Sequence, residues 1–400
     1  MARLLALLLT ALVLAAPAAA SPYLQAGIQD DAWLRYGSGT LDDRLDTLDA
    51  LGVDVVRYTL NWRELQPTRT RFEWSSSDAV LHGLQAHGIA PVVTLWGTPG
   101  WANGGLGPNV APRRSADFVR FVRAAAIRYP FVKKWLVWNE PNKAPFLKPA
   151  SAKTYVQRLL NPAYAAIHAA GRGSLVGGGV TGPIAGAGGV SPVAFIKAMQ
   201  HYGAHLDAYA HNPYPANPQH ETPFAGGCVP CATITMATID KLVRLAGSKR
   251  IWLTEYAYQT DDPYLGVSRP LQALYLGEGA LHAWLTPKVD MLIHYTVRDD
   301  SEPGGWQSGL LTEAGAPKPA YAAFRFPTAA NGRHGLWGQI RPRAGKQPYR
   351  VQRLVSGRWK TVGPPRWTDA RGTLKVSVAP GRYRIWSTRD ASAGAAVVVG

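Results

Sequence analysis

The stretch TLDDRLDTLDALGVDVVRYTLNW (Thr40–Trp62) contains the unit from which the fold can be derived. Its first half carries leucines at helical spacing from Leu41 to Leu51, and Gly52 follows the last of them. Its second half, Val53–Trp62, is an apolar run of strand length that is rich in β-branched residues. Helices that alternate with such buried strands are typical of parallel sheets.

The same unit recurs on both sides of this stretch, from residue 23 to residue 326. The expected strands are Tyr23–Gln29, Val53–Trp62, Ile89–Trp96, Val132–Trp138, Ser174–Val180, Leu206–His211, Ile251–Glu255 and Val289–Tyr295. The expected helices are Thr40–Leu51, Ser77–His87, Ser115–Tyr129, Ala152–Ala170, Pro192–Tyr202, Ala232–Ala246, Pro270–Leu285 and Ala320–Phe326. Eight units over about 300 residues predict a closed (β/α)8 barrel. A doubly wound open sheet is the competing fold, but the first strand–helix turn lacks its glycine-rich phosphate loop.

The N-terminus has the pattern of a leader. Residues 1–20 combine a basic start at Arg3, the apolar run Leu4–Ala16 and a small-residue end at Ala18-Ala19-Ala20. This pattern predicts a secretory signal peptide, and therefore a secreted, extracellular protein. The apolar run is shorter than the roughly 20 residues that cross a bilayer, so we expect no membrane span.

After Pro327 the pattern changes to short alternating segments, which predict a small all-β, sandwich-like module over residues 328–400, following a barrel domain over 21–327. Its expected strands are Leu336–Ile340, Tyr349–Leu354, Arg358–Val362, Thr373–Val378 and Arg382–Ser387. The module holds 14 Lys and Arg against two acids, so it carries +12 of the total charge of +17. We expect it to contact a polyanion, either an acidic cell wall or an acidic polysaccharide, unless its cations only solvate the surface. Export argues against a specific nucleic-acid partner.

Two glutamates follow predicted strands at the rim where barrel active sites lie, the C-terminal ends of the strands. Glu140 follows the fourth strand and Glu255 ends the seventh. Glycoside hydrolysis needs such a pair, because one carboxylic acid protonates the departing oxygen while the other carboxylate attacks or activates water. A single strand-end glutamate is as often a salt-bridge partner, but two on one rim, flanked by aromatic residues, favour the catalytic interpretation.

The segment Trp138-Asn139-Glu140-Pro141 resembles the Asn-Glu-Pro signature of clan A, the large clan of retaining barrel glycosidases. Val55–Arg57, Trp252–Glu255 and the exit from Gly309 to Tyr321 resemble the same clan, so the resemblance covers residues 25–326 in order. The Trp-Asn-Glu-Pro-Asn form is most similar to families 39 and 5, which the motif does not separate. The resemblance implies a carbohydrate substrate and cleavage of β-glycosidic bonds by double displacement, with Glu140 as acid/base and Glu255 as nucleophile.

The resemblance also implies roles for residues around the two glutamates. Asn139 would bind the sugar 2-hydroxyl, while Arg57 and Tyr214 would lie against Glu255 and keep it ionised. His211 would line the site.

One departure from the clan pattern concerns the sugar-binding floor. Many relatives end strand eight with a tryptophan, where this chain reads His294-Tyr295-Thr296. Tyr295 or the nearby Trp306 is expected to replace it, and Trp96 is a further candidate for stacking on sugar.

Two other functions stay open from the sequence: a catalytically inactive barrel that binds glycans, and a cell-surface adhesion protein. The presence of both glutamates favours the enzyme. We expect no cofactor and no metal, because the pair His201 and His205 is interrupted by Gly203 and lies before strand six, at the wrong end of the barrel. The only cysteines, Cys228 and Cys231, are expected to form a local disulfide in an exported chain.

Overall fold

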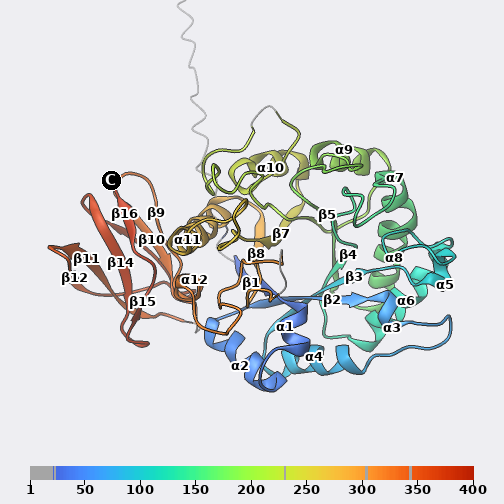
Figure 1. Cartoon of the computed structure of the whole chain (residues 1–400), viewed down its shortest axis with the longest axis horizontal. Helices are drawn as coiled ribbons and strands as arrows, with labels where there is room; N and C mark the ends of the chain where they lie inside the picture. The colour runs from blue at the N-terminus through green and yellow to red at the C-terminus, as the bar shows by residue number, and fades with distance from the viewer. Residues whose placement is uncertain (1–20, 22–23, 229–230, 302–304, 342–344) are drawn as a thin grey trace, which may run out of the picture.

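The computed structural model describes residues 21, 24–228, 231–301, 305–341 and 345–400. Its larger part is a closed barrel in which eight parallel strands follow one another in chain order and β1 pairs with β8 (Figure 1). The strands are β1 (Gln25–Gln29), β2 (Val55–Asn61), β3 (Ala90–Trp96), β4 (Lys134–Val137), β5 (Leu175–Thr181), β6 (Ala208–His211), β7 (Arg250–Tyr256) and β8 (Val289–Tyr295). The predicted (β/α)8 fold is therefore confirmed.

Helices surround the barrel and pack on the outward side chains of its strands. They are α1 (Asp31–Tyr36), α2 (Leu41–Leu51), α3 (Trp62–Leu65), α4 (Ser75–Ala86), α5 (Gly100–Asn103), α6 (Ser115–Arg128), α7 (Ala152–Thr154), α8 (Asn161–Ala170), α9 (Pro192–His201), α10 (Asp240–Ala246), α11 (Arg269–Leu285) and α12 (Pro319–Arg325). In α2, Thr40 and Asp43 form a capping box, and Gly52 ends the helix in the left-handed conformation at φ 72°. Local sequence thus fixes both ends of this helix.

The barrel interior is filled by side chains that alternate inward along the strands. Val55, Leu136, Trp252 and Ile293 belong to one buried cluster there. A Cβ at Gly177 in β5 would lie 2.7 Å from the Trp252 ring, so this glycine makes room for the largest interior side chain. The interior is consequently a packed core, and only the rim of the barrel is open to a ligand.

Two predicted helices differ from the observed elements. The segment Ala152–Ala170 is helical throughout, but its middle, η1 (Tyr155–Leu160), has the wider π-helical winding. The segment 232–246 becomes α-helical only at Asp240, after the 3-10 turn η2 (Met236–Thr238). Its first residues hydrogen-bond to neighbouring loops instead, since Ile234 N donates to Pro183 O.

The C-terminal module consists of two antiparallel sheets, which confirms the predicted all-β, sandwich-like architecture. One sheet has the order β13-β10-β9, and the other has the order β12-β11-β14-β15 with β16 pairing with β14. The strands are β9 (Thr328–Ala330), β10 (Gly335–Gln339), β11 (Pro348–Val355), β12 (Arg358–Trp367), β13 (Thr373–Ser377), β14 (Gly381–Ser387), β15 (Ser392–Ala393) and β16 (Val397–Val399). The short strands β9, β15 and β16 were not predicted.

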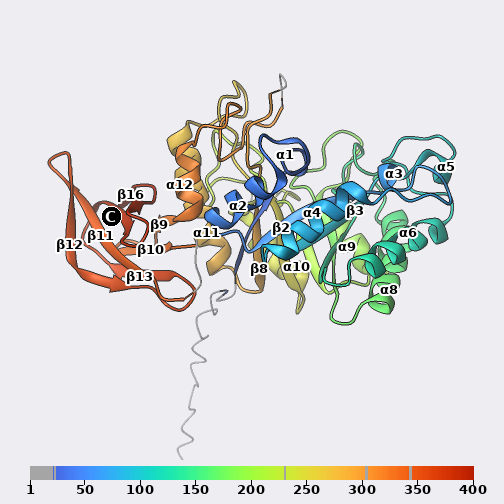
Figure 2. The same cartoon turned by 90° about the horizontal axis from the view of Figure 1, so that it is seen from below.

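The module packs on the barrel through its smaller sheet. Trp337 of β10 lies against Trp284 of α11 with ring centroids 5.9 Å apart, in a buried cluster that also contains Leu281 and Ala329. Figure 2 shows β11 and β12 on the side of the module away from the barrel. The predicted signal peptide lies outside the described residues, and in the described part of the chain no helix is long and apolar enough to cross a membrane.

Candidate active site

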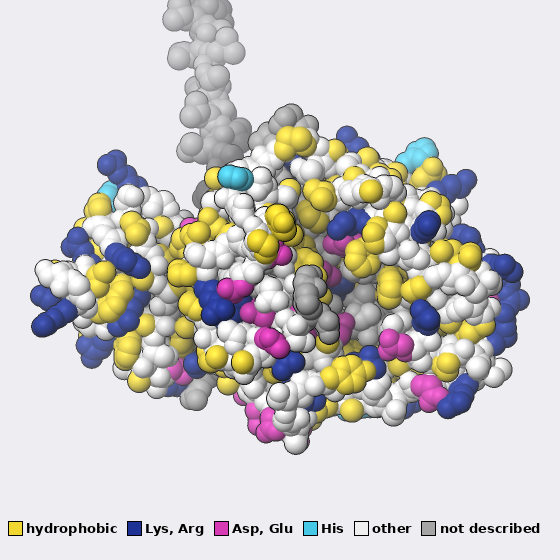
Figure 3. Space-filling view, in the orientation of Figure 1, with side chains coloured by type: hydrophobic (Ala, Val, Ile, Leu, Met, Phe, Trp, Pro, Cys, Tyr) yellow, Lys and Arg dark blue, Asp and Glu magenta, His cyan; other side chains and the backbone are white. Residues whose placement is uncertain are grey.

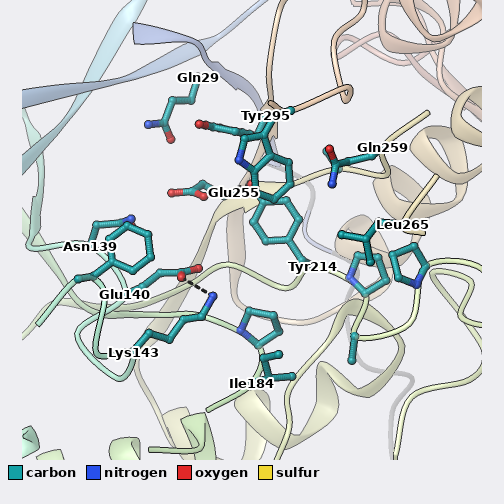
Figure 4. Close-up of a pocket in the computed structure, with 17 residues that line it drawn as sticks. Gln29, Asn139, Glu140, Lys143, Ile184, Tyr214, Glu255, Gln259, Leu265 and Tyr295 are labelled. Carbon is teal, nitrogen blue, oxygen red and sulfur yellow. Dashed lines mark hydrogen bonds and ion pairs between the residues drawn. The ribbon is translucent and has the colours of Figure 1, made fainter. Parts of the chain in front are cut away.

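A pocket of about 510 Å³ opens at the C-terminal ends of the barrel strands. This face of the molecule is hollowed near its centre (Figure 3), and Figure 4 shows the side chains around the hollow. The lining residues are Gln29, Asn139, Glu140, Lys143, Phe146, Pro183, Ile184, Tyr214, Pro215, Ala216, Pro218, Glu255, Ala257, Gln259, Leu265, Tyr295 and Trp306. Both glutamates that the sequence selects are therefore in one pocket.

Glu255 is held by a cation and a phenol. Arg57 donates to its Oε1, and Tyr214 Oη donates to its Oε2 over 3.1 Å. Burial raises the pKa of Glu255, while the Arg57 guanidinium opposes that rise. With both oxygens accepting hydrogen bonds from fixed donors, Glu255 is oriented as a carboxylate.

Arg57 itself is fully buried and fixed on two further sides. Its Nε donates to Thr94 Oγ1 over 2.9 Å, and its Nη2 donates to Asn139 Oδ1 over 2.8 Å. The second bond leaves the Asn139 Nδ2 group as the donor on the other side of that amide. One guanidinium thus positions both the carboxylate of Glu255 and the predicted sugar-binding amide.

Glu140 has different partners. Asn212 Nδ2 donates to its Oε1 over 3.1 Å, and Lys143 Nζ lies 2.8 Å from its Oε2. The Glu140 backbone is left-handed at φ 38°, as is that of Trp138 at φ 71°. Non-glycine residues in this region carry a conformational cost and cluster at functional sites. The turn at Trp138 also ends β4 one residue earlier than predicted.

A glycine gives Glu140 its space. A Cβ at Gly182 would lie 2.8 Å from Glu140 Cδ and 2.8 Å from Lys143 Cδ. Gly182 is tied to the same turn, because its backbone N donates to Asn142 Oδ1 over 2.8 Å. The end of β5 is therefore shaped to receive the Glu140 carboxyl group.

Three aromatic rings in contact line the pocket. Tyr295 at the end of β8 meets Trp306 edge-on with centroids 5.4 Å apart, and Tyr214 lies 5.3 Å from the same indole. Asp300 accepts a hydrogen bond from Trp306 N over 2.8 Å, which fixes the loop. Tyr295 and Trp306 thus both occupy the region where the sequence resemblance places a sugar-binding aromatic residue.

Three of the predicted site residues do not line the pocket: Arg57, which lies buried against Glu255, His211 and Trp96. His211 is fully buried, where Thr181 Oγ1 lies 2.8 Å from its Nδ1 and Ile234 O lies 2.9 Å from its Nε2. Burial lowers the pKa of His211 to about 4, so it is neutral at neutral pH and joins β6 to its neighbours. Trp96 is partly buried beside Trp138, with centroids 6.2 Å apart.

Several residues of the site were not selected from the sequence. Asn212 and Lys143 both contact Glu140, and both are near a strand end that the sequence identified. Asn212 follows β6 directly, so a systematic reading of strand ends finds it. Leu265, by contrast, comes from the long loop after β7, where no periodic pattern points to the pocket.

Cys228 and Cys231 form the predicted disulfide. Lys241 supports this loop, because its Nζ donates to the carbonyl oxygens of Cys228 at 2.7 Å, Cys231 at 2.9 Å and Thr233 at 3.1 Å. Within the described ranges, no group of three or more His, Cys, Asp or Glu side chains is arranged to hold a metal ion.

No protein-family model and no curated protein matches the sequence. The structure is similar to that of a family 39 glycoside hydrolase from Bacteroides cellulosilyticus WH2, with a TM-score of 0.62 and 15% identity over 89% of this chain and 79% of that chain. It is also similar to a glucosidase from Croceicoccus marinus, with a TM-score of 0.61 and 12% identity over 92% and 95% of the two chains.

Xylanase 10B from Thermotoga petrophila RKU-1 has a TM-score of 0.52 and 13% identity over 75% of this chain and 92% of that chain. The structural neighbours are thus glycoside hydrolases, including families 39, 5 and 1, in agreement with the clan A resemblance of the sequence. At these identities the likeness establishes a shared fold, and the activity must be argued from the site.

Proposed function

We propose that this protein is a secreted, retaining glycoside hydrolase that cleaves β-glycosidic bonds of an oligo- or polysaccharide. The observation that carries the proposal is the pairing of Glu140 and Glu255 in one pocket with unlike partners. Glu255 is bound by Arg57 and Tyr214, which suit an anionic nucleophile, whereas Glu140 contacts an amide and a single partly exposed ammonium. Two carboxyl groups in different environments take different roles.

In the first step, a Glu255 oxygen forms a bond to the anomeric carbon while the bond to the leaving oxygen breaks and Glu140 gives that oxygen its proton. In the second step, water transfers a proton to Glu140 and its oxygen replaces Glu255 at the anomeric carbon. Asn139 lies where its Nδ2 can donate to the 2-hydroxyl, and Trp306 and Tyr295 offer apolar faces to the ring. The alternative, a glycan-binding barrel without activity, gives no reason for this arrangement of both glutamates.

The test is a panel of aryl β-glycosides and of plant, fungal and bacterial polysaccharides. We expect turnover of at least one aryl β-glycoside, with NMR spectra of the first product showing the β-anomer before mutarotation. An α-anomer as first product would exclude the double displacement, and binding of glycans without turnover would favour the inactive barrel. The export part is tested separately by N-terminal sequencing of the secreted protein. Cleavage of the leader after Ala20 leaves Ser21 as its first residue.

We further propose that the basic module brings the enzyme to an acidic polysaccharide. On the outer face of the larger sheet, the Arg384 guanidinium lies 4.5 Å from the Trp359 ring and 5.7 Å from the Trp386 ring, and donates to Gln352 Oε1 over 2.7 Å. Arg350 is the cross-strand neighbour of Trp386. Indole faces interleaved with guanidinium groups suit sugar rings that carry carboxylates.

Charge reversal on this face is expected to abolish retention on an acidic polysaccharide while leaving binding to neutral polysaccharides unchanged. The variant is Arg350→Glu with Arg384→Glu, and the control is Arg333→Glu with Arg389→Glu, which makes the same charge change at other exposed sites of the module. Retention of the wild-type protein should fall with added salt, because screening acts over about 8 Å at physiological ionic strength. Equal retention of both double variants and wild type at low salt would refute a role for this face. Truncation at residue 327 is less suitable, since it would uncover Trp284.

A further inference from the structure

The proposed general acid is paired with a cation. Lys143 Nζ lies 2.8 Å from Glu140 Oε2, and Figure 4 shows the contact on the side of Glu140 away from Glu255. The exposed fractions of the two side chains are 25% and 5%, so the pair is partly shielded from water. The first step of hydrolysis needs Glu140 in its protonated form, and a protonated Glu140 no longer forms an ion pair with Lys143.

The charged side chains that line the pocket leave one cation without an anionic partner when Glu140 is protonated. Lys143 is the only Lys or Arg among the described residues that line it, and the only lining acids are Glu140 and Glu255. Glu255 already has its cation in Arg57. Once Glu140 takes up a proton, Lys143 is left without an anionic partner in the pocket. An anionic group on the bound substrate would restore the balance.

The position of Lys143 indicates which part of the substrate carries that anion. A general acid lies beside the leaving oxygen of the glycosidic bond. Lys143, which forms an ion pair with Glu140 on the side away from Glu255, therefore faces the leaving sugar. Phe146 and Ile184 line the pocket with Lys143, and Lys143 Nζ lies 6.0 Å from the Phe146 ring centroid. This end of the pocket thus offers one ammonium next to apolar surface, which suits a sugar ring with a single charged substituent.

We propose that Lys143 binds a carboxylate or sulfate group on the leaving sugar, so that the substrate is an acidic saccharide. In this proposal, which rests on the proposed hydrolase function, the substrate anion replaces Glu140 as the charged partner of Lys143 when Glu140 is protonated. Lys143 is then a specificity residue for the leaving-group subsite. The proposal is independent of the basic module, since it depends only on contacts inside the barrel pocket.

The test uses aryl β-glycosides of one sugar that differ only in the aglycone: 3-carboxyphenyl, 3-sulfophenyl and the neutral 3-carbamoylphenyl. The readout is the ratio of kcat/KM for each anionic aglycone to that for the neutral one, compared between proteins, so that intrinsic leaving-group differences cancel. We expect Lys143→Met to lower this ratio about tenfold relative to wild type for at least one of the two anions, and Lys143→Arg to keep most of it. Lys148→Met, an exposed site five residues further on, should keep the wild-type ratio.

Each outcome has one meaning. A drop for the carboxyphenyl substrate alone identifies a carboxylate site, a drop for the sulfophenyl substrate alone identifies a site for an –SO3⁻ group such as that of a sulfated sugar, and a drop for both identifies an anion site that accepts either group. Equal ratios in wild type and Lys143→Met, with the neutral substrate still hydrolysed, overturn the inference and leave the hydrolase proposal intact. If wild type hydrolyses no glycoside of the panel described above, both proposals fail. Circular dichroism of each variant checks the fold, and Lys143→Arg supplies the comparison if the methionine variant unfolds.

Discussion

Glu255→Ala is expected to lower kcat on aryl β-glycosides by roughly 10⁴-fold or more, because the covalent step loses its nucleophile. The fold should persist, since Glu255 is at the pocket surface and its removal leaves a space that water can enter. Arg57 would then lack its carboxylate partner, so some loss of thermal stability is expected as well. Steady-state kinetics and thermal melting of the variant measure both effects.

Azide separates the loss of a nucleophile from the loss of any other group. In Glu255→Ala, azide can enter the vacated space and attack an activated glycoside directly, giving a glycosyl azide of inverted configuration. A product of retained configuration would contradict the assignment of Glu255. Glu313→Ala, which removes an exposed carboxylate after β8, is the matched control and should keep the wild-type rate.

The sequence predicted the barrel well because its strands are apolar on both faces and its helices are amphipathic, two patterns that differ in period. The interior strand β8 was predicted without error in its bounds, Val289–Tyr295. Short strands of the module were missed because three residues such as Val397–Val399 give no period at all. They form because longer strands offer an edge for pairing: β14 pairs with β15 and β16, and β10 pairs with β9.

The candidate site was predicted in part. Residues at or just after the C-terminal ends of strands, such as Glu140, Glu255 and Tyr295, reach the pocket because the barrel directs all these ends to one rim. His211 also ends a strand, yet its ring is used to join Thr181 and the Ile234 carbonyl. Strand periodicity predicts which residues lie at the rim of the barrel. The direction of the side chain at the last residue of a strand depends on tertiary hydrogen bonds, which the periodicity does not show.

Lys143 shows a different limit of sequence reasoning. It lies three residues after Glu140, so its proximity along the chain was visible, but its contact with the carboxyl group depends on the left-handed turn at Glu140 and on the space beside Gly182. The basic charge of residues 328–400 was visible from counting alone. An acidic substrate would explain the cation in the pocket and the cations of the module by one chemistry.

Glu140→Ala is expected to separate two classes of substrate. For a natural oligosaccharide or an alkyl glycoside, whose leaving oxygen needs a proton, kcat/KM should fall by about 10³-fold or more. For a 2,4-dinitrophenyl glycoside, whose leaving group departs as a stable anion, the first step should be nearly unaffected and deglycosylation should become limiting. The expected signature is therefore a low kcat together with a low KM on the activated substrate, because the glycosyl-enzyme accumulates.

Azide should accelerate turnover of that substrate and give a glycosyl azide of retained configuration, since it attacks the intermediate from the face that Glu140 vacates. Glu140→Gln tests the same point with the side-chain volume kept. Equal losses on natural and activated substrates, with no effect of azide, would show that Glu140 is not the acid/base, even though it shares the pocket with Glu255.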